Sequence, residues 1–148
     1  MTDSASGIAI SDDTATLVNG ALEHGTPVLL AYVDQNSQAR LSFRGSAQVY
    51  SPDQLAVWVR NPEGGLQAAL ANNPQLTLMY RDPPTRTTIF FYGRGRIESD
   101  QAIRDHVYDA SPEGERRADS DKKGLPLIID LDQVTGGSPD ARFDMRRA

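Results

Sequence analysis

The stretch "QLAVWVRNPEGGLQAALANNPQLTLMYRD", Gln54 to Asp82, has a strand-like apolar run at each end and a helical centre. Its alanine- and leucine-rich part predicts a helix over residues 63–73. Gly64 and Gly65 open this helix, although only proline is less favourable in a helix interior. Two explanations stay open. The glycines let the backbone approach an anion that the free N–H groups of the helix bind, or they ease a tight turn.

Two further strands are predicted before this stretch. "PVLLAYVD" (residues 27–34) is a continuous apolar run of strand length, which predicts a central strand buried on both faces. "ARLSFRGSAQVYS" (39–51) alternates, with Leu41 and Phe43 on one face and polar residues on the other. We therefore expect the face of Leu41 and Phe43 to join the core and the polar face to meet ligand or solvent.

The second half of the chain predicts two long strands. "TTIFFYGRGRIES" (87–99) carries Gly93 and Gly95 on one strand face, which indicates a bulge or a close backbone approach. "LPLIIDLDQV" (125–134) is the last predicted strand, and "TGGSPDARFDMRRA" after it reads as a loosely held tail.

These runs make six strands in mostly hairpin succession, with short helices at the start, after the third strand and before the sixth. This order predicts a mainly β fold, a six-stranded antiparallel barrel. We expect a polar N-terminal arm over 1–15, one barrel domain over 16–135 and a C-terminal tail over 136–148.

The composition excludes several classes of protein. The 148 residues include no cysteine and carry a net charge of −5, which argues against nucleic acid as a partner. No apolar run approaches the roughly 20 residues that span a membrane, and the polar, acidic start predicts a cytoplasmic location. Residues 40–96 differ from the rest, with seven arginines, no lysine and three acidic residues, a charge of +4. Arginine suits phosphate and carboxylate, so this segment indicates a local anion site.

The side chains alone form no catalytic constellation. His24 and His106 are the only histidines and lie far apart in the chain, so no metal site is expected. Redox chemistry in such a protein would need a bound cofactor.

The order of these segments, with the short helical run that ends in "ANNP" before a strand, resembles the pyridoxamine 5′-phosphate oxidase-like family. These proteins are FMN-binding split barrels that include flavin- and deazaflavin-dependent reductases. The resemblance covers roughly residues 27–134, and it implies a six-stranded split β-barrel that binds FMN between two subunits.

The resemblance also implies which residues bind the cofactor. Arg40 matches a basic residue that approaches the flavin phosphate, and Ser42 follows it on the same strand. Thr88 matches a polar residue that reaches the flavin ring from the other subunit. The phosphate would be held by the end of the third strand and the start of the next helix, which here are Arg60, Asn61, Gly64, Gly65 and Leu66.

The chain also departs from the family. Many members have a Ser-Arg-Lys-like triplet where this chain has Gly64, Gly65 and Leu66, and the oxidases' C-terminal tryptophan and arginine have no counterpart. Oxidation of pyridoxamine phosphate itself is therefore not expected. Asn61 and Pro62 read as the N-cap and first residue of the helix. Arg60 would then be the main charged contact to the phosphate, while Glu63 in the first turn would compete with that phosphate.

The leading hypothesis is an FMN-binding oxidoreductase with an unidentified small-molecule substrate. It would be a homodimer with the cofactor at the subunit interface, and its 87–96 strand would be partly buried there, because that strand carries aromatic residues on both faces. One alternative is a reductase that uses a deazaflavin. Another is a flavin-binding or stress-related protein without turnover.

Overall fold

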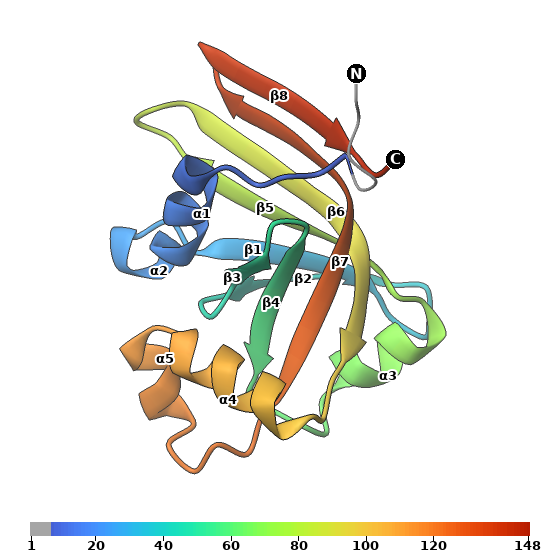
Figure 1. Cartoon of the computed structure of the whole chain (residues 1–148). Coiled ribbons are helices and arrows are strands. Elements are labelled where there is room, and N and C mark those ends of the chain that lie inside the picture. The colour runs from blue at the N-terminus through green and yellow to red at the C-terminus, as the bar shows by residue number, and fades with distance from the viewer. Residues whose placement is uncertain (1–6) are drawn as a thin grey trace.

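The computed structural model describes residues 7–148, which form eight strands and five helices (Figure 1). The helices are α1 (Asp12–Asn19), α2 (Ala21–His24), α3 (Gly65–Asn72), α4 (Gln101–Ala110) and α5 (Glu113–Ala118). The strands are β1 (Val28–Val33), β2 (Ala39–Arg44), β3 (Gln48–Ser51), β4 (Gln54–Val59), β5 (Gln75–Asp82), β6 (Thr87–Ile97), β7 (Leu125–Ser138) and β8 (Ala141–Arg146). The prediction of a mainly β fold with short helices is confirmed.

All strands belong to one antiparallel sheet in the order β2-β1-β5-β6-β7-β4-β3, and β8 pairs with β7 beyond this path. The predicted number of six strands is wrong by two. The run over 39–51 breaks into β2 and β3, because residues 45–47 turn and the Ala47 N–H donates to the Arg44 carbonyl at 3.2 Å. The expected loose tail instead extends β7 and forms β8.

The connection between β2 and β3 explains why the barrel is split. These strands lie at the two ends of the sheet order, yet only residues 45–47 join them. The sheet therefore curls until its ends are adjacent. No ladder pairs β2 with β3 within residues 7–148, so the barrel stays open along this line.

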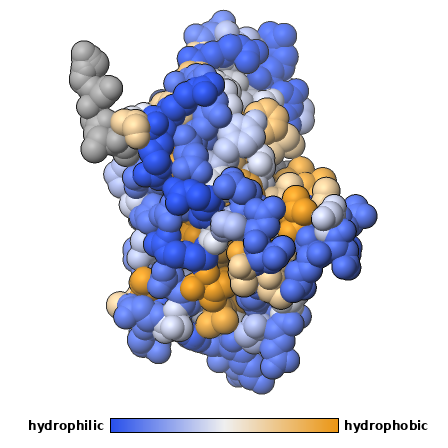
Figure 2. Space-filling model, turned by 90° about the vertical axis from the view of Figure 1, so that its right-hand side faces the viewer, coloured by the Kyte–Doolittle hydropathy of each residue, from blue (hydrophilic) through white to orange (hydrophobic). Residues whose placement is uncertain are grey.

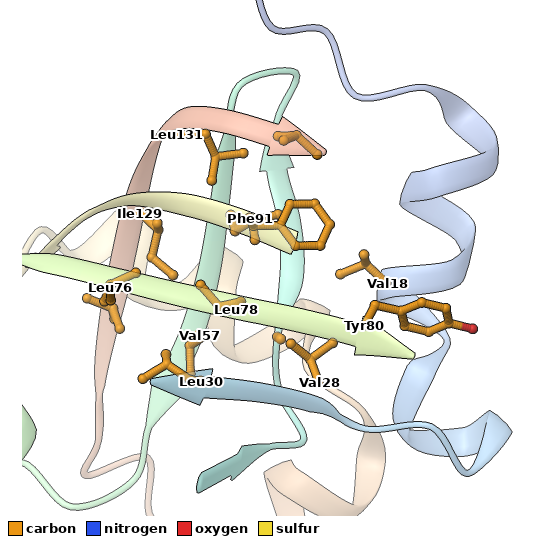
Figure 3. Close-up of a cluster of buried hydrophobic side chains, with 14 of the residues drawn as sticks. Val18, Val28, Leu30, Val57, Leu76, Leu78, Tyr80, Phe91, Ile129 and Leu131 are labelled. Carbon is orange, nitrogen blue, oxygen red and sulfur yellow. The ribbon is translucent and has the colours of Figure 1, made fainter. Parts of the chain in front are cut away.

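The core fills the inside of the curled sheet. Leu30, Leu78 and Phe91 come from three neighbouring strands and are fully buried, and Ile129 faces them from β7 (Figure 3). Helix α1 covers the same core with Val18, which is 1% exposed. Gly25 ends α2 in the left-handed conformation at φ 86°, which glycine adopts readily.

A second, smaller cluster lies on the opposite side of β4 and β7. Val107 of α4 packs there against Trp58 and Ile128. This contact fixes α4, and through it α5, beside the end of β4. The chain from α5 to β7 therefore passes close to the split, which places its charged residues at the candidate site.

The bulge predicted around Gly93 is present. The β6–β7 register shifts between Tyr92 and Gly93, and Asp132 is the extra residue on β7. A Cβ on Gly93 would lie 2.3 Å from the Asp130 carbonyl oxygen. Close backbone approach thus requires glycine at this position.

The two faces of β2 are oriented opposite to the prediction. Leu41 and Phe43 are 67% and 66% exposed, whereas Ser42 and Arg44 lie on the inner face. The prediction assigned the apolar face to the core, but in this strand the apolar face points out. Burial of β1 on both faces is also wrong, since only its inner face is buried.

An apolar row therefore crosses the outside of the sheet. The strand registers place Phe43 opposite Leu29, Leu29 opposite Met79, and Met79 opposite Phe90. Seen from the right-hand side of Figure 1, hydrophobic residues reach the surface in patches among hydrophilic ones (Figure 2).

Among residues 7–148, no helix has the length and apolar character needed to cross a membrane.

Candidate functional site

A cavity of about 690 Å³ lies at the split of the barrel. Its walls come from the end of β2 and the turn after it, the end of β4, the loop into α3, and the segment around α5. The lining residues are Tyr32, Phe43, Arg44, Gly45, Ser46, Trp58, Val59, Arg60, Asn61, Pro62, Gly64, Gly65, Leu66, Gln67, Glu115, Asp119 and Lys123. Of the eight residues that the sequence predicted for the cofactor site, Arg60, Asn61, Gly64, Gly65 and Leu66 line this cavity.

Arg44 is the most buried positive group of the cavity. Its Nε is buried and has no hydrogen-bond partner among residues 7–148. Burial lowers the pKa of this guanidinium and the nearby Arg60 charge lowers it further, while Tyr32 and Glu115 act in the opposite direction. Burial of one guanidinium N–H without an acceptor is costly, and a partly buried positive charge stabilises an anion placed beside it.

Arg60 directly follows β4 and also lines this cavity. Its side chain is more exposed than that of Arg44. The side chain is 53% exposed, and its Nε lies 3.9 Å from the Glu115 carboxylate. Lys123 lines the cavity from the other side. Two guanidinium groups and an ammonium group thus share one cavity, which suits a phosphate or carboxylate.

The start of α3 differs from the prediction. The helix covers Gly65–Asn72 rather than 63–73, and Gly64 is its N-cap, without a side-chain hydrogen bond. Asn61 is not the N-cap, because its Oδ1 instead accepts the Glu63 N–H at 3.0 Å in the turn before the helix. Glu63 therefore lies outside the first turn, which contains no acidic residue. The predicted competitor for an anion is absent from the first turn.

The structure also distinguishes the two explanations for the glycines. Gly64 has ordinary extended backbone, with φ −76° and ψ 171°, and Gly65 is not among the glycines with positive φ. A Cβ on Gly64 would come no closer than 3.4 Å to the Asn61 side chain, and one on Gly65 would meet nothing within 4 Å. The turn itself therefore does not need glycine. Open space above Gly65 instead allows a ligand to approach the backbone.

Carboxylates balance part of the positive charge. Asp119 accepts hydrogen bonds from Trp58 Nε1 at 2.8 Å and from the backbone N–H groups of Lys123 and Gly124 at 3.0 and 2.9 Å. Burial raises the pKa of Asp119, but these hydrogen bonds outweigh it, so the pKa is lowered overall. Asp119 thus already has several hydrogen-bond partners, whereas among residues 7–148 Glu115 has one ion-pair partner, Arg60.

The other three predicted residues lie outside this cavity. Arg40 is exposed and its Nε donates to Asp34 at 2.8 Å, beside a smaller cavity of about 240 Å³ that shares Gly65 with the main one. Ser42 faces the barrel interior, where its Oγ is buried without a hydrogen-bond partner. Thr88 lies on the outer face of the sheet and accepts a hydrogen bond from Arg81 at 2.6 Å. One chain therefore does not bring Thr88 to the cavity.

Sequence reasoning missed several lining residues. Arg44 shares a strand face with Arg40 and Ser42, which the family resemblance had indicated, so the alternation of this strand could have pointed to it as well. Glu115, Asp119 and Lys123 gave no such signal, because nothing in a charged loop segment indicates where it folds back.

No metal centre is suggested by the described residues, since residues 7–148 bring together no group of three or more histidine, aspartate or glutamate side chains able to bind one. His24 is exposed and lies 3.6 Å from Asp82, and neither residue lines the cavity. His106 packs edge-on against the Tyr50 ring at 5.2 Å.

The sequence matches no protein-family model, and no curated protein is detectably similar to it. Solved structures are nevertheless similar in fold. HupZ of Group A Streptococcus has 14% identity and a TM-score of 0.69, over 87% of this chain and 97% of that one. A Clostridium acetobutylicum protein related to general stress protein 26, of the pyridoxinephosphate oxidase family, has 12% identity and a TM-score of 0.66, over 93% and 96%. An FMN-binding protein from Syntrophomonas wolfei has 9% identity and a TM-score of 0.59, over 82% and 84%.

The chain thus has a split-barrel fold that FMN-binding proteins also have. More particularly, the fold is that of the pyridoxamine 5′-phosphate oxidase-like proteins, as the order of segments in the sequence predicted.

Proposed function

We propose that this protein is an FMN-binding oxidoreductase whose flavin phosphate binds in the cavity at the split. One observation carries the proposal. At this cavity a buried guanidinium nitrogen of Arg44 lacks an acceptor, and the backbone of Gly65 is open to approach. An anion in the cavity would neutralise the partly buried guanidinium charge of Arg44 and use the space above Gly65. The shared fold with an FMN-binding protein supports flavin as the source of that anion.

The residues of the cavity have distinct roles in this proposal. Arg44 and Arg60 would supply charge-assisted hydrogen bonds to the phosphate oxygens, and the free N–H groups at the start of α3 would add donors. Asn61 would keep the turn before α3 in place, and Leu66, which is 3% exposed, would anchor the helix in the core. Bound flavin would supply the redox chemistry, transferring electrons to or from a small-molecule substrate.

The same proposal includes a homodimer with the flavin at the subunit interface. The row from Phe43 across Leu29 and Met79 to Phe90 is the kind of apolar surface that a second subunit covers. Thr88 and Tyr92 lie on the same outer face, so Thr88 would contact a flavin held by the other copy. Sedimentation at tens of micromolar tests this, and a clean monomer there would contradict it.

A deazaflavin-dependent reductase is the second candidate. The main cavity adjoins the smaller one beside Arg40 at Gly65, so positive side chains extend beyond a single phosphate site. This extent would suit a cofactor with a longer acidic tail. A flavin-binding protein without turnover is the third candidate, and the shared fold with a protein related to general stress protein 26 supports it.

Titration of the purified protein separates these candidates. We expect FMN to bind with quenching of its fluorescence and a shift in its visible absorption, and more weakly to Arg60→Ala. Tighter binding of a deazaflavin would favour the second candidate. Bound flavin that no reductant or substrate turns over would favour the third, and the absence of binding by both cofactors would overturn the proposal.

A further inference from the structure

Helix α5 places one carboxylate inside the cavity. None of its six residues is buried, so the helix contributes no side chain to the core. Glu115 is nevertheless only 20% exposed, because its side chain turns into the cavity. The helix therefore brings a charge to the site rather than packing to the barrel.

The Glu115 carboxylate lies between the two halves of the split. One oxygen is 3.9 Å from Arg60 Nε. The other lies 2.8 Å from the position that a Cβ on Gly45 would take. Gly45 follows Arg44 and belongs to the turn that joins β2 to β3. The carboxylate thus fills space beside both arginines, and a side chain at position 45 would push it out.

The position of α5 is set by contacts on both sides of it. The single hydroxyl proton of Tyr108 is shared between the carbonyl oxygens of Arg116 and Asp119, which lie 3.1 and 3.0 Å from Oη. Trp58 Nε1 donates to the Asp119 carboxylate at 2.8 Å. These contacts hold the backbone next to Glu115, whereas the side chain makes a single ion pair among residues 7–148, at a long 3.9 Å, so that displacing it would cost little.

We propose that Glu115 is a built-in competitor for the anion site and sets its affinity. Without ligand, its carboxylate neutralises Arg60 and occupies room beside Arg44. A phosphate that enters must break the Arg60–Glu115 ion pair and displace the side chain. This inference rests on the proposed function, since it assumes that the cavity binds a phosphate-bearing ligand.

Glu113 is a matched control on the same helix. It is 70% exposed and lies 4.0 Å from Arg117, four residues along, outside the cavity. Glu113→Gln and Glu115→Gln change the net charge equally and keep the shape of the side chain. Only the second removes a carboxylate from the cavity.

Trp58 provides a direct readout, because it is the only tryptophan of the chain and lines the cavity. We would titrate wild type and both variants with inorganic phosphate and with FMN, following tryptophan fluorescence, with calorimetry as a second measure of the dissociation constants. Removal of one negative charge about 5 Å from the ligand strengthens binding by about fourfold in water and more in a partly buried cavity. We expect at least this gain for Glu115→Gln with both ligands and no change for Glu113→Gln.

The outcomes separate this inference from the proposed function. If FMN binds to wild type and Glu115→Gln equally, the competitor role is wrong while flavin binding stands. If FMN binds to neither but phosphate binds more tightly to Glu115→Gln, the competitor role stands and the flavin is wrong. An equal gain from Glu113→Gln, or no anion binding by any variant, overturns the inference. Glu115→Ala gives the same test if the Gln variant does not fold.

Discussion

The bulge of β6 and β7 and the split between β2 and β3 both combine glycine with arginine, but they do so in opposite ways. At the bulge, Arg94 donates to both oxygens of Asp132, at 3.0 and 3.1 Å, and Arg147 donates to the same carboxylate at 3.2 Å. Gly93 is crowded by the Asp130 carbonyl. At the split, Arg44 Nε has no acceptor and Gly65 is crowded by nothing.

This difference distinguishes residues that the fold itself requires from residues that are candidates for binding a ligand. Where a chain satisfies its own charges and fills its own space, the residue types are explained by the fold alone. Where a buried guanidinium nitrogen lacks an acceptor and a glycine has free space around it, the fold does not explain them, and we propose that a ligand does. Each region therefore predicts a different consequence of substitution.

The largest effect is expected at the bulge. In Gly93→Ala, the added Cβ would lie 2.3 Å from a backbone oxygen, so two paired strands must move apart. Overpacking of this kind costs typically 1–3 kcal/mol, and contact with backbone places it at the upper end, about 3 kcal/mol. Chemical denaturation would measure the loss. A variant as stable as wild type would show that the bulge glycine is not required by packing.

The next effect is on binding at the split. Arg60→Ala should weaken FMN binding about tenfold to a hundredfold, because a charge-assisted phosphate contact contributes roughly 1.5–3 kcal/mol. Arg40→Ala should act in the same direction but less strongly, because Arg40 lies outside the main cavity and is paired with Asp34. The melting temperature without cofactor should change little, since Arg60 is half exposed and its ion pair is long.

Arg94→Ala is the control for that experiment. It removes an arginine from the bulge, so it should lower stability and leave the FMN dissociation constant unchanged.

Equal FMN affinity in wild type and Arg60→Ala would contradict the prediction for Arg60 and would mean that the phosphate binds elsewhere.

The sequence predicted the two regions unequally. Alternation and glycine spacing predicted the antiparallel strands and the bulge, because these depend on local geometry and on contacts that repeat along a strand. The predicted orientation of β2 was wrong. An apolar strand face can point outward as well as inward when another surface, in place of the core, can cover it. Leu41 and Phe43 carry no local mark of that choice.

The candidate site was only partly predicted, and the reason is related. The loop from Arg60 to Leu66 is contiguous, so its residues could be recognised together. Glu115 lies 55 positions after Arg60 and reaches it only because α4 packs on β4 and β7. Such a pairing depends on tertiary packing that no local pattern encodes.

Gly65→Ala tests whether the space above α3 belongs to a ligand. Alanine fits the present backbone without a clash and is the better helix former, so the cofactor-free protein should gain up to about 1 kcal/mol in stability. Affinity for FMN should fall by about 1 kcal/mol, roughly fivefold, because the methyl group takes ligand space. Thermal melting and FMN titration on the same samples would measure both. Unchanged affinity would mean that no ligand approaches this backbone.

The smallest effect concerns the closed charge cluster at the bulge, which should respond to pH without any ligand. Hydrogen bonding by Arg94 lowers the pKa of Asp132, burial opposes it, and Arg147 lowers it further. The folded protein thus binds fewer protons than the unfolded chain, so the stabilisation is full above the unfolded pKa of about 3.9 and is lost as pH falls through the lower folded value. Asp132→Asn should therefore be less stable than wild type at pH 7, by less than about 1 kcal/mol since the group is partly exposed, and the difference should shrink below about pH 4. Denaturation curves at pH 7, 5, 4 and 3 would measure this. A difference that stays constant down to pH 3 would mean that the Asp132 carboxylate does not stabilise the bulge through its charge.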